Sequence, residues 1–147
     1  MKNIKTILID DESRGLATQK KLLEMNCPEV DVLCCCSNAE DAKKKILELR
    51  PHLVFLDIAM PGKNGLELLN EVEQIDFEII FITAYNNFMT QAFHFSAVDY
   101  LLKPVQNKEL KEAIEKHLKN SQQKIPSEQI DLLLNNVQAE RKGKRGR

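Results

Sequence analysis

The chain has 147 residues, with 21 basic and 22 acidic side chains and a formal net charge of −1. This size fits one ordinary domain, and the balanced charge excludes wholesale electrostatic binding to nucleic acid or to a membrane surface. No apolar stretch is long enough to cross a membrane and the N-terminal apolar run is too short for a signal peptide, so we expect a cytoplasmic protein with no membrane contact.

Apolar runs of strand length alternate along the chain with amphipathic stretches of helix length. The strand candidates are residues 4–9, 30–36, 52–56, 78–83 and 98–102. Apolar residues recur at helical spacing at Ala39, Ala42, Ile46 and Leu49, at Leu66, Leu69 and Val72, and at Leu110, Ala113, Ile114, His117 and Leu118. For Phe88, Phe93 and Phe95, in the predicted fourth helix, core packing is the default expectation, with a share in a signalling interface as the alternative. This alternation predicts an α/β fold, a doubly wound parallel sheet of five strands with helices on both faces.

Polar residues follow the predicted strands at the points where the strands end. In a doubly wound sheet, ligands bind in the crevice outside the carboxyl ends of the strands. The residues at these ends are Asp10, Asp11 and Glu12 after the first strand, Asp57 after the third, Thr83 in the fourth, and Lys103 with Pro104 after the fifth. Each has an ordinary structural explanation, but together they bring carboxylates, a hydroxyl and an ammonium group to one edge of the sheet.

This combination of side chains suits phosphoryl chemistry. Neighbouring carboxylates either titrate as a coupled group or hold a hard cation, and oxygen ligands with room for water favour Mg²⁺ over Zn²⁺. One carboxylate can act as a nucleophile and form an aspartyl phosphate, to whose oxygens Lys103 and Thr83 donate hydrogen bonds. Asp57 stands alone at the tip of a buried apolar strand, and the Pro61–Gly62 turn leaves space in front of it. Asp57 is therefore the candidate nucleophile.

The motifs around these residues resemble a known family. They are "DD" at Asp10 and Asp11, "FLDIAMPGKNGLEL" around Asp57, "FITAY" around Thr83, and "DYLLKP" ending in Lys103 and Pro104. Over residues 3 to about 121, the chain resembles the receiver domain of bacterial two-component response regulators. The resemblance implies a flavodoxin-like fold with strand order 2-1-3-4-5. It also implies a protein that is not an enzyme, beyond catalysing its own phosphorylation and dephosphorylation.

The resemblance implies how the chain binds phosphate and metal. Asp57 would accept a phosphoryl group from a sensor histidine kinase. Asp10, Asp11 and Asp57, with the backbone carbonyl of Ala59, would bind Mg²⁺. Lys103 would pair with the phosphate.

The resemblance also implies a conformational switch. Thr83 would move towards the phosphoryl oxygens, and Tyr100 would be the aromatic residue that turns inward with it. The bond between Lys103 and Pro104 would be cis, which would aim the lysine into the pocket. Phosphorylation would then bias the face formed by the fourth helix, fifth strand and fifth helix between two arrangements.

A finer resemblance concerns the output. The stretch "FITAYNNFMTQAFHFSAVDYLLKPV" is similar to receivers attached to LytTR-type DNA-binding domains, in transcriptional regulators of the LytR/AlgR type. It implies a homodimer on activation, with DNA contacted only through an absent C-terminal domain. We expect a receiver domain at 1–121 and a linker at 122–147 that stops before the DNA-binding domain. The linker would hold an amphipathic helix, with Ile130, Leu133, Leu134 and Val137, and the basic tail 140–147. This helix would either pack back on the receiver or act as a connector or dimer-forming helix that transmits the switch.

Other classes of protein fit the sequence less well. Haloacid-dehalogenase-like phosphatases also use an aspartate nucleophile with Mg²⁺, but they need a second carboxylate two residues on, where this chain has Ala59. A nucleotide-binding protein would need a glycine-rich loop after the first strand. A stand-alone or phosphorylation-independent receiver that acts as an interaction module stays open as the alternative function. The run Cys34, Cys35 and Cys36 is expected to fill space and not to bind metal.

Overall fold

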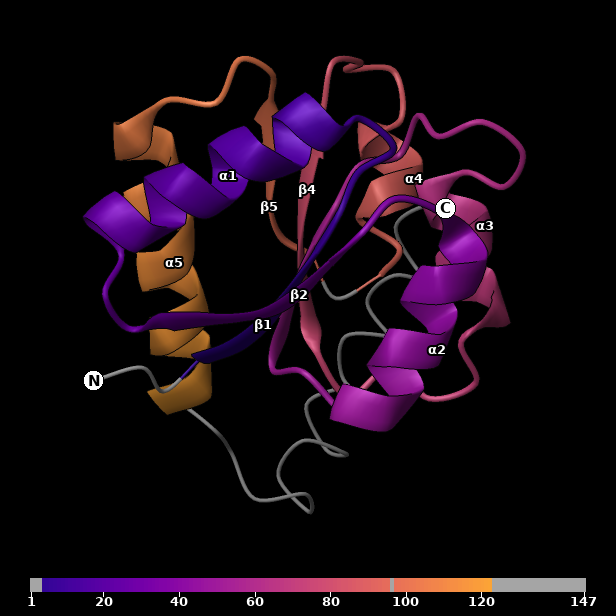
Figure 1. Ribbon diagram of the computed structural model, residues 1–147, viewed down its shortest axis with the longest axis horizontal. Helices are drawn as coiled ribbons and strands as arrows, with labels where there is room; N and C mark the ends of the chain where they lie inside the picture. Colours follow the sequence, from indigo (N-terminus) through magenta and orange to yellow (C-terminus); the bar gives the residue numbers. More distant parts are fainter. Residues whose placement is uncertain (1–3, 96, 123–147) are drawn as a thin grey trace, which may run out of the picture. The chain divides into compact units, whose positions relative to one another are not determined.

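The computed structural model describes residues 4–95 and 97–122, in which strands and helices alternate (Figure 1). The elements are β1 (Ile4–Ile9), α1 (Ser13–Asn26), β2 (Val30–Cys36), α2 (Ala39–Leu49), β3 (Leu53–Leu56), α3 (Gly65–Glu71), β4 (Glu78–Thr83), α4 (Met89–Ala92), β5 (Ala97–Leu102) and α5 (Asn107–Gln122). The predicted strands differ from these by at most one residue at their starts.

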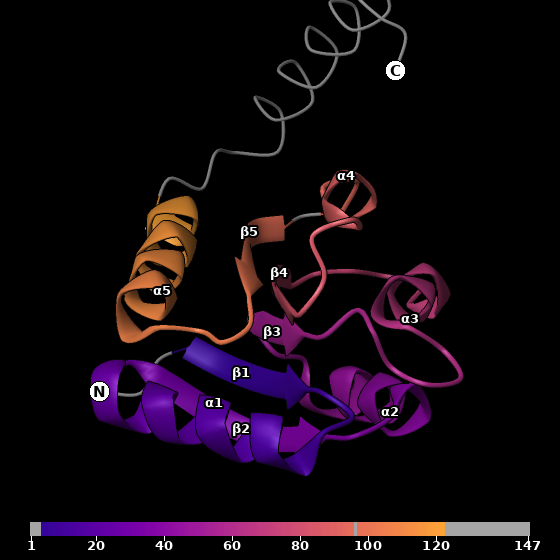
Figure 2. The ribbon, with the colours of Figure 1, turned by 90° about the horizontal axis from the view of Figure 1, so that it is seen from above.

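The five strands form one parallel sheet in the order β2-β1-β3-β4-β5. Figure 2 shows α1 and α5 on one side of the sheet and α2, α3 and α4 on the other. This confirms the predicted doubly wound α/β fold, its flavodoxin-like strand order and its two helical layers. From β1 the chain first adds β2 on one side of the sheet, and then adds β3, β4 and β5 on the other side of β1. The carboxyl ends of β1 and β3 therefore flank the crevice where ligands bind in such folds.

The central strands are buried on both faces, which explains their continuous apolar sequences. All four residues of β3, Leu53–Leu56, are 0% exposed. Side chains alternate along a strand, and Val54 and Leu56 belong to a core cluster with Ile46 of α2 and Leu68 of α3. The buried core therefore holds the carboxyl end of β3 rigidly.

Helices α2 and α3 each begin with a polar capping residue, Asn38 and Asn64. The side chain of Asn38 accepts a hydrogen bond from the backbone N–H of Asp41 at the start of α2. Asn64 and Glu67 form a reciprocal capping box at the start of α3, with both hydrogen bonds at 2.9 Å. Such caps satisfy backbone N–H groups that have no partner within the helix, and they fix where the loop after β3 ends.

The fourth helix is shorter than its apolar residues suggest. It has four residues, because the backbone N–H groups of His94 and Phe95 bond to carbonyls three residues earlier and tighten the chain out of the α-helix. Phe88 and Phe95 pack against the core cluster, but Phe93 is 52% exposed. The expectation that all three phenylalanines pack into the core was therefore wrong for Phe93.

The end of the chain is described only in part. Residues Met1–His117 form one compact unit, and Leu118–Arg147 form a second, of which the structure describes 118–122. Within the first unit, Nδ1 of His117 lies 2.6 Å from Oε1 of Glu78, which ties α5 to β4. The predicted linker helix and basic tail lie outside the described residues. No helix within the described residues is long and apolar enough to cross a membrane.

Candidate phosphoryl-transfer site

Two buried carboxylates stand side by side at the carboxyl edge of the sheet. Asp10 follows β1 and is 0% exposed; Asp57 follows β3 and is 4% exposed. The backbone N–H of Asp57 donates to the carbonyl of Ile9 at 2.9 Å, and that of Asp10 to the carbonyl of Cys36 at 3.0 Å. Each aspartate thus continues the hydrogen bonding of its strand, so the sheet sets the position of both carboxylates.

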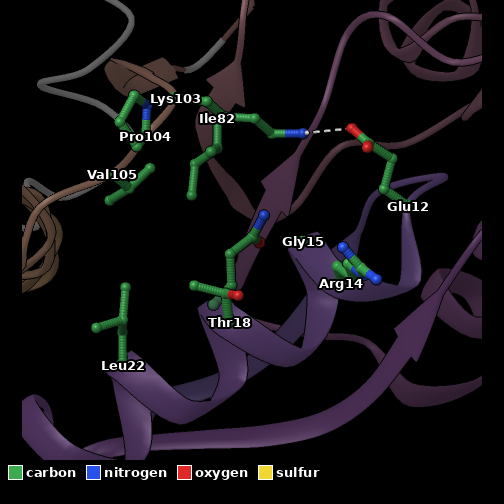
Figure 3. Close-up of a pocket in the computed structure, with 10 residues that line it drawn as sticks. Glu12, Arg14, Gly15, Thr18, Leu22, Ile82, Lys103, Pro104 and Val105 are labelled. Carbon is green, nitrogen blue, oxygen red and sulfur yellow. Dashed lines mark ion pairs between the residues drawn. The ribbon is translucent and has the colours of Figure 1, made fainter.

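Lys103 joins these two carboxylates. Its Nζ lies 2.8 Å from Oδ2 of Asp10 and 2.8 Å from Oδ2 of Asp57. It also forms a longer ion pair with Glu12, at 3.6 Å, which Figure 3 shows across the top of a cavity. The Lys103–Pro104 peptide bond is cis. One ammonium group therefore offsets the repulsion between two buried carboxylates from different strands.

The remaining oxygens of both aspartates accept hydrogen bonds from local N–H groups. Oδ1 of Asp57 accepts from the backbone N–H of Ala59 at 3.0 Å, and Oδ1 of Asp10 accepts from that of Glu12 at 3.0 Å. These bonds hold each carboxylate in one orientation. Oδ2 of Asp57 then faces Lys103, the group that a phosphoryl oxygen would also contact.

The pKa values at the site follow from burial and from this shared lysine. Burial raises the pKa of the Asp57 carboxyl above its ordinary value, and the charge of Asp10 adds to this, whereas Lys103 and the N–H of Ala59 act in the opposite direction. Burial lowers the pKa of Lys103, but its hydrogen bonds to Asp10 and Asp57 outweigh burial, so its pKa is raised. Lys103 is therefore a permanent cation at this site.

The acidic residues after β1 form a cluster of oxygen donors. Asp10, Asp11 and Glu12 each offer a carboxylate oxygen, and these atoms lie within 4.8 Å of one another. Hard oxygen donors that leave room for water suit Mg²⁺, so the donor set fits the predicted metal. Glu12 belongs to this cluster although the expected ligand set omits it. Asp57 is connected to the cluster through Lys103. We call these four carboxylates the acid pocket.

Thr83 and Tyr100, the predicted switch residues, meet at the backbone of Tyr85. Thr83 is buried at the end of β4, and its Oγ1 accepts from the N–H of Tyr85 at 3.5 Å. Tyr100 is 8% exposed, and its hydroxyl donates to the carbonyl of Tyr85. The Tyr100 ring lies 5.9 Å from that of Phe81, centroid to centroid. Both switch residues thus hold the loop that leads from β4 to α4.

Three residues near the acid pocket were not predicted from the sequence. Gln19 and Gly15 of α1 contact or closely approach Asp10, and Gly65 lies against the backbone of Asp57. The helical pattern of α1 gave no reason to single out a glutamine on its apolar face. Gly65 is the last residue of the turn "PGKNG", which already contains Gly62. A second glycine in the same turn was the sequence signal that the backbone there lies close to another part of the chain.

Replacing Gly65 with alanine should disturb Asp57. A Cβ at residue 65 would lie 2.5 Å from the carbonyl oxygen of Asp57 and 3.1 Å from Cα of Ile58, and backbone atoms cannot turn away. We expect Gly65→Ala to lower the free energy of unfolding by about 2 kcal/mol, as overpacking does, and to slow phosphoryl uptake. Gly62→Asn is the matched control, because nothing lies within 4 Å of a Cβ there and asparagine tolerates its φ of 80°. If denaturant unfolding showed the same loss of unfolding free energy for Gly65→Ala and Gly62→Asn, the predicted clash with Asp57 would be contradicted.

A cavity of about 400 Å³ adjoins the acid pocket between α1 and the loop that follows β5. Figure 3 shows Thr18 and Leu22 of α1 on one side, Pro104 and Val105 on the other, and the ion pair between Lys103 and Glu12 at the edge of the cavity. Its walls are mainly apolar, and its mouth carries charge. The cavity therefore adjoins the acid pocket at Glu12 and at its ion-pair partner Lys103.

Comparisons with known proteins agree with this geometry. A sequence model of the family described as response regulator receiver domain matches residues 6–115. The chain is 34% identical over 124 residues to sensory transduction protein LytT of Bacillus cereus, covering 83% of this chain and 50% of that protein. It is 36% identical over 140 residues to transcriptional regulatory protein BtsR of Salmonella typhi, covering 92% of this chain and 55% of that protein.

Solved structures show the same fold. The response regulatory domain of mrkE from Klebsiella pneumoniae has a TM-score of 0.74 at 25% identity, covering 82% of this chain and all of that one. The REC domain of AraT, a response regulator from Geobacillus stearothermophilus, has a TM-score of 0.72 at 27% identity, covering 81% of this chain and 96% of that one. The chain belongs to the receiver domains of two-component response regulators, as its motifs predicted. It spans about half the length of the curated relatives it matches.

Proposed function

We propose that this receiver accepts a phosphoryl group on Asp57 from a sensor histidine kinase and thereby switches an output domain. The observation that carries the proposal is the position of Asp57 at the end of β3, buried and 2.8 Å from the shared cation Lys103. The direct test is uptake of one phosphoryl group from a small acyl phosphate, with and without Mg²⁺.

The chemistry follows from the acid pocket. An oxygen of Asp57 forms a bond to phosphorus while the bond between phosphorus and the imidazole nitrogen of the kinase histidine breaks, and the leaving imidazole takes up a proton from solvent. Lys103 then pairs with a phosphoryl oxygen in place of the free carboxylate. The same site, with water as nucleophile, would remove the phosphoryl group again. The chain thus acts as a signalling domain whose only catalysis is on itself.

Mg²⁺ fits this proposal. Asp10, Asp11 and Asp57, with the carbonyl of Ala59, would hold it, and Glu12 adds a further oxygen donor to the same cluster. When bound, the ion neutralises phosphoryl oxygens and helps to align the attacking and leaving groups. The chain's own residues orient Asp57 through the N–H of Ala59, and Lys103 lies between Asp57 and Asp10 and pairs with both.

The switch would start at Thr83. Its hydroxyl oxygen accepts from the N–H of Tyr85 here, and its O–H can donate to a phosphoryl oxygen, which would draw Thr83 towards Asp57. Movement of Thr83 would release the backbone of Tyr85, which also holds the hydroxyl of Tyr100. The loop before α4 and the neighbouring face of β5 would then change arrangement together.

The output proposed is regulation of transcription through a LytTR-type DNA-binding domain. Support comes from relatives named LytT, a sensory transduction protein, and BtsR, a transcriptional regulatory protein, of which this chain covers about half. In this proposal the receiver forms a homodimer when phosphorylated, works in the cytoplasm, and contacts DNA only through the other domain. The receiver occupies residues 1–121 and the linker 122–147.

The cavity beside the acid pocket is a candidate contact for the kinase. Leu22 supplies part of its apolar wall. We expect Leu22→Ala to slow phosphoryl transfer from a sensor histidine kinase about tenfold, the loss of one apolar anchor at an interface, and to leave uptake from a small acyl phosphate unchanged. The control is Leu47→Ala, a leucine of α2 that is 63% exposed. Equal transfer rates for Leu22→Ala and the wild type would remove this surface from the proposal.

A further inference from the structure

Gln19 is a buried polar residue with no part in the function proposed so far. The buried residues of α1 are Leu16, Gln19 and Leu23, whose spacing forms the stripe that faces the core. Gln19 is 5% exposed, as deeply placed as the leucines of the same stripe. A leucine would fill such a position without burying an amide, so packing alone does not account for the glutamine.

The amide of Gln19 is directed at the acid pocket. Its Nε2 donates to Oδ2 of Asp10 at 3.2 Å. Its Oε1 is buried and has no hydrogen-bond partner among the described residues. The opposite orientation of the amide would place this oxygen against the carboxylate, so the interaction that keeps Gln19 in place is the donation to Asp10. Leaving Oε1 without a partner is energetically unfavourable, and the hydrogen bond from Nε2 to Asp10 offsets this cost.

Gly15 allows α1 to come this close. It lies four residues before Gln19, on the same face of the helix. A Cβ at residue 15 would lie 2.7 Å from Oδ2 of Asp10, the same oxygen that accepts from Gln19. The helix thus presents Asp10 with an open surface at one turn and a hydrogen-bond donor at the next.

The hydrogen bond from Gln19 to Asp10 is important because Lys103 is shared between Asp10 and Asp57. Oδ2 of Asp10 accepts from Gln19 and also pairs with Nζ of Lys103, which lies equally close to Oδ2 of Asp57. A phosphoryl group on Asp57 adds negative charge and draws Lys103 towards it. Asp10 is fully buried and would then lose its ion pair with Lys103, while the amide of Gln19 would remain as a donor to it.

We propose that Gln19 is a positioning residue for the acid pocket. Its amide fixes Asp10 in the orientation that Mg²⁺ binding needs, and keeps this carboxylate hydrogen-bonded while Lys103 contacts the phosphoryl group. The inference rests on the proposed function, in which Asp10 helps to hold Mg²⁺. Hydrogen bonds from outer residues to metal-binding side chains commonly change metal affinity about 10-fold to 100-fold.

The test compares Gln19→Met with Leu23→Met in the full chain. Both place the same unbranched side chain on the buried stripe of α1, but only the first removes a donor to Asp10. Titration calorimetry should give a Mg²⁺ dissociation constant about tenfold higher for Gln19→Met and within about twofold of wild type for Leu23→Met. After removal of an acyl phosphate donor, the half-life of the phosphoryl group should change in Gln19→Met alone.

Two outcomes of the comparison would overturn the inference. One is a Gln19→Met variant that binds Mg²⁺ as the wild type does, whatever its unfolding temperature. The other is equal weakening in both methionine variants, which would assign the effect to packing of α1. If Gln19→Met does not fold, NMR of the wild type decides, because the side-chain amide resonances of Gln19 must shift on addition of Mg²⁺; unshifted resonances reject the inference.

The proposed function can fail separately. A wild type that binds Mg²⁺ but takes up no phosphoryl group from an acyl phosphate or from a kinase overturns the role of Asp57. In that case a tenfold weaker Mg²⁺ affinity in Gln19→Met would still support its positioning of Asp10, and an unchanged affinity would reject both.

Discussion

After incubation with a small acyl phosphate and Mg²⁺, intact mass spectrometry should show one added phosphoryl group on the wild type and none on Asp57→Asn. The neutral amide of asparagine lacks the charged oxygen that attacks phosphorus. Of the carboxylates in the acid pocket, only Asp57 lies at the end of β3, where its oxygen faces Lys103. Omitting Mg²⁺ should abolish uptake by the wild type as well.

Asp99→Asn is the control for Asp57→Asn. Asp99 also pairs with a lysine, Nζ of Lys116 at 2.8 Å, but it lies on β5 away from the acid pocket. The Asp99→Asn variant should take up one phosphoryl group, as the wild type does. Uptake by Asp57→Asn equal to that of Asp99→Asn would place the acceptor elsewhere and overturn the proposed function.

The pH dependence of stability gives a second readout for Asp57→Asn, measured without Mg²⁺. Burial raises the pKa of Asp57 in the folded state, so the ionised carboxylate lowers stability at neutral pH. This loss begins to shrink as the pH falls to the folded-state pKa and is gone below the lower pKa of the unfolded state. Asp57→Asn should therefore be more stable than the wild type at neutral pH, with an advantage that shrinks on acidification. An advantage that grows at low pH would contradict the direction of the pKa shift.

Removing Lys103 should have the largest effect on stability. Lys103→Met leaves two buried carboxylates, Asp10 and Asp57, without their shared cation. Breaking such a pair leaves uncompensated buried charge, so we expect the free energy of unfolding to fall by about 3 kcal/mol at neutral pH. Addition of Mg²⁺ should recover part of this loss, because a ligand of the folded state stabilises it. Phosphoryl uptake should also slow, and urea unfolding with and without Mg²⁺ measures the stability change.

Lys116→Met separates this effect from the general loss of a lysine. Its Nζ lies at the same distance from a carboxylate, but the Lys116 side chain is 55% exposed and that of Lys103 is 21% exposed. Exposed ion pairs contribute little, so Lys116→Met should cost less than about 1 kcal/mol. Similar losses for the two variants would show that Lys103 does not compensate buried charge.

The strands and the residues at their ends followed from the sequence because each depends on local pattern. The apolar run before Asp57 predicts a buried strand, and a parallel sheet brings the ends of its strands to one edge. Asp10, Asp57 and Lys103 could thus be grouped before any distance was known. The strand order itself came from the resemblance to receivers, since alternation alone does not fix it.

The remaining features depend on tertiary contacts that no periodic pattern reports. Gln19 occupies an apolar position of α1, and only the approach of that helix to Asp10 explains it. The shortness of α4 depends on the tight turns after Ala92, which leave Phe93 exposed where its hydrophobicity predicted burial.

The link between Tyr100 and Tyr85 has a practical consequence. These are the two tyrosines of a chain that contains no tryptophan, and the hydroxyl of one is hydrogen-bonded to the backbone of the other. Tyrosine emission therefore originates from two places that this hydrogen bond connects, Tyr100 on β5, which is buried, and Tyr85 in the loop between β4 and α4, which is 53% exposed. If phosphorylation moves Thr83 and Tyr100 as proposed, the tyrosine emission of the native molecule should change with it, so the proposed switch can be followed in real time without any attached dye.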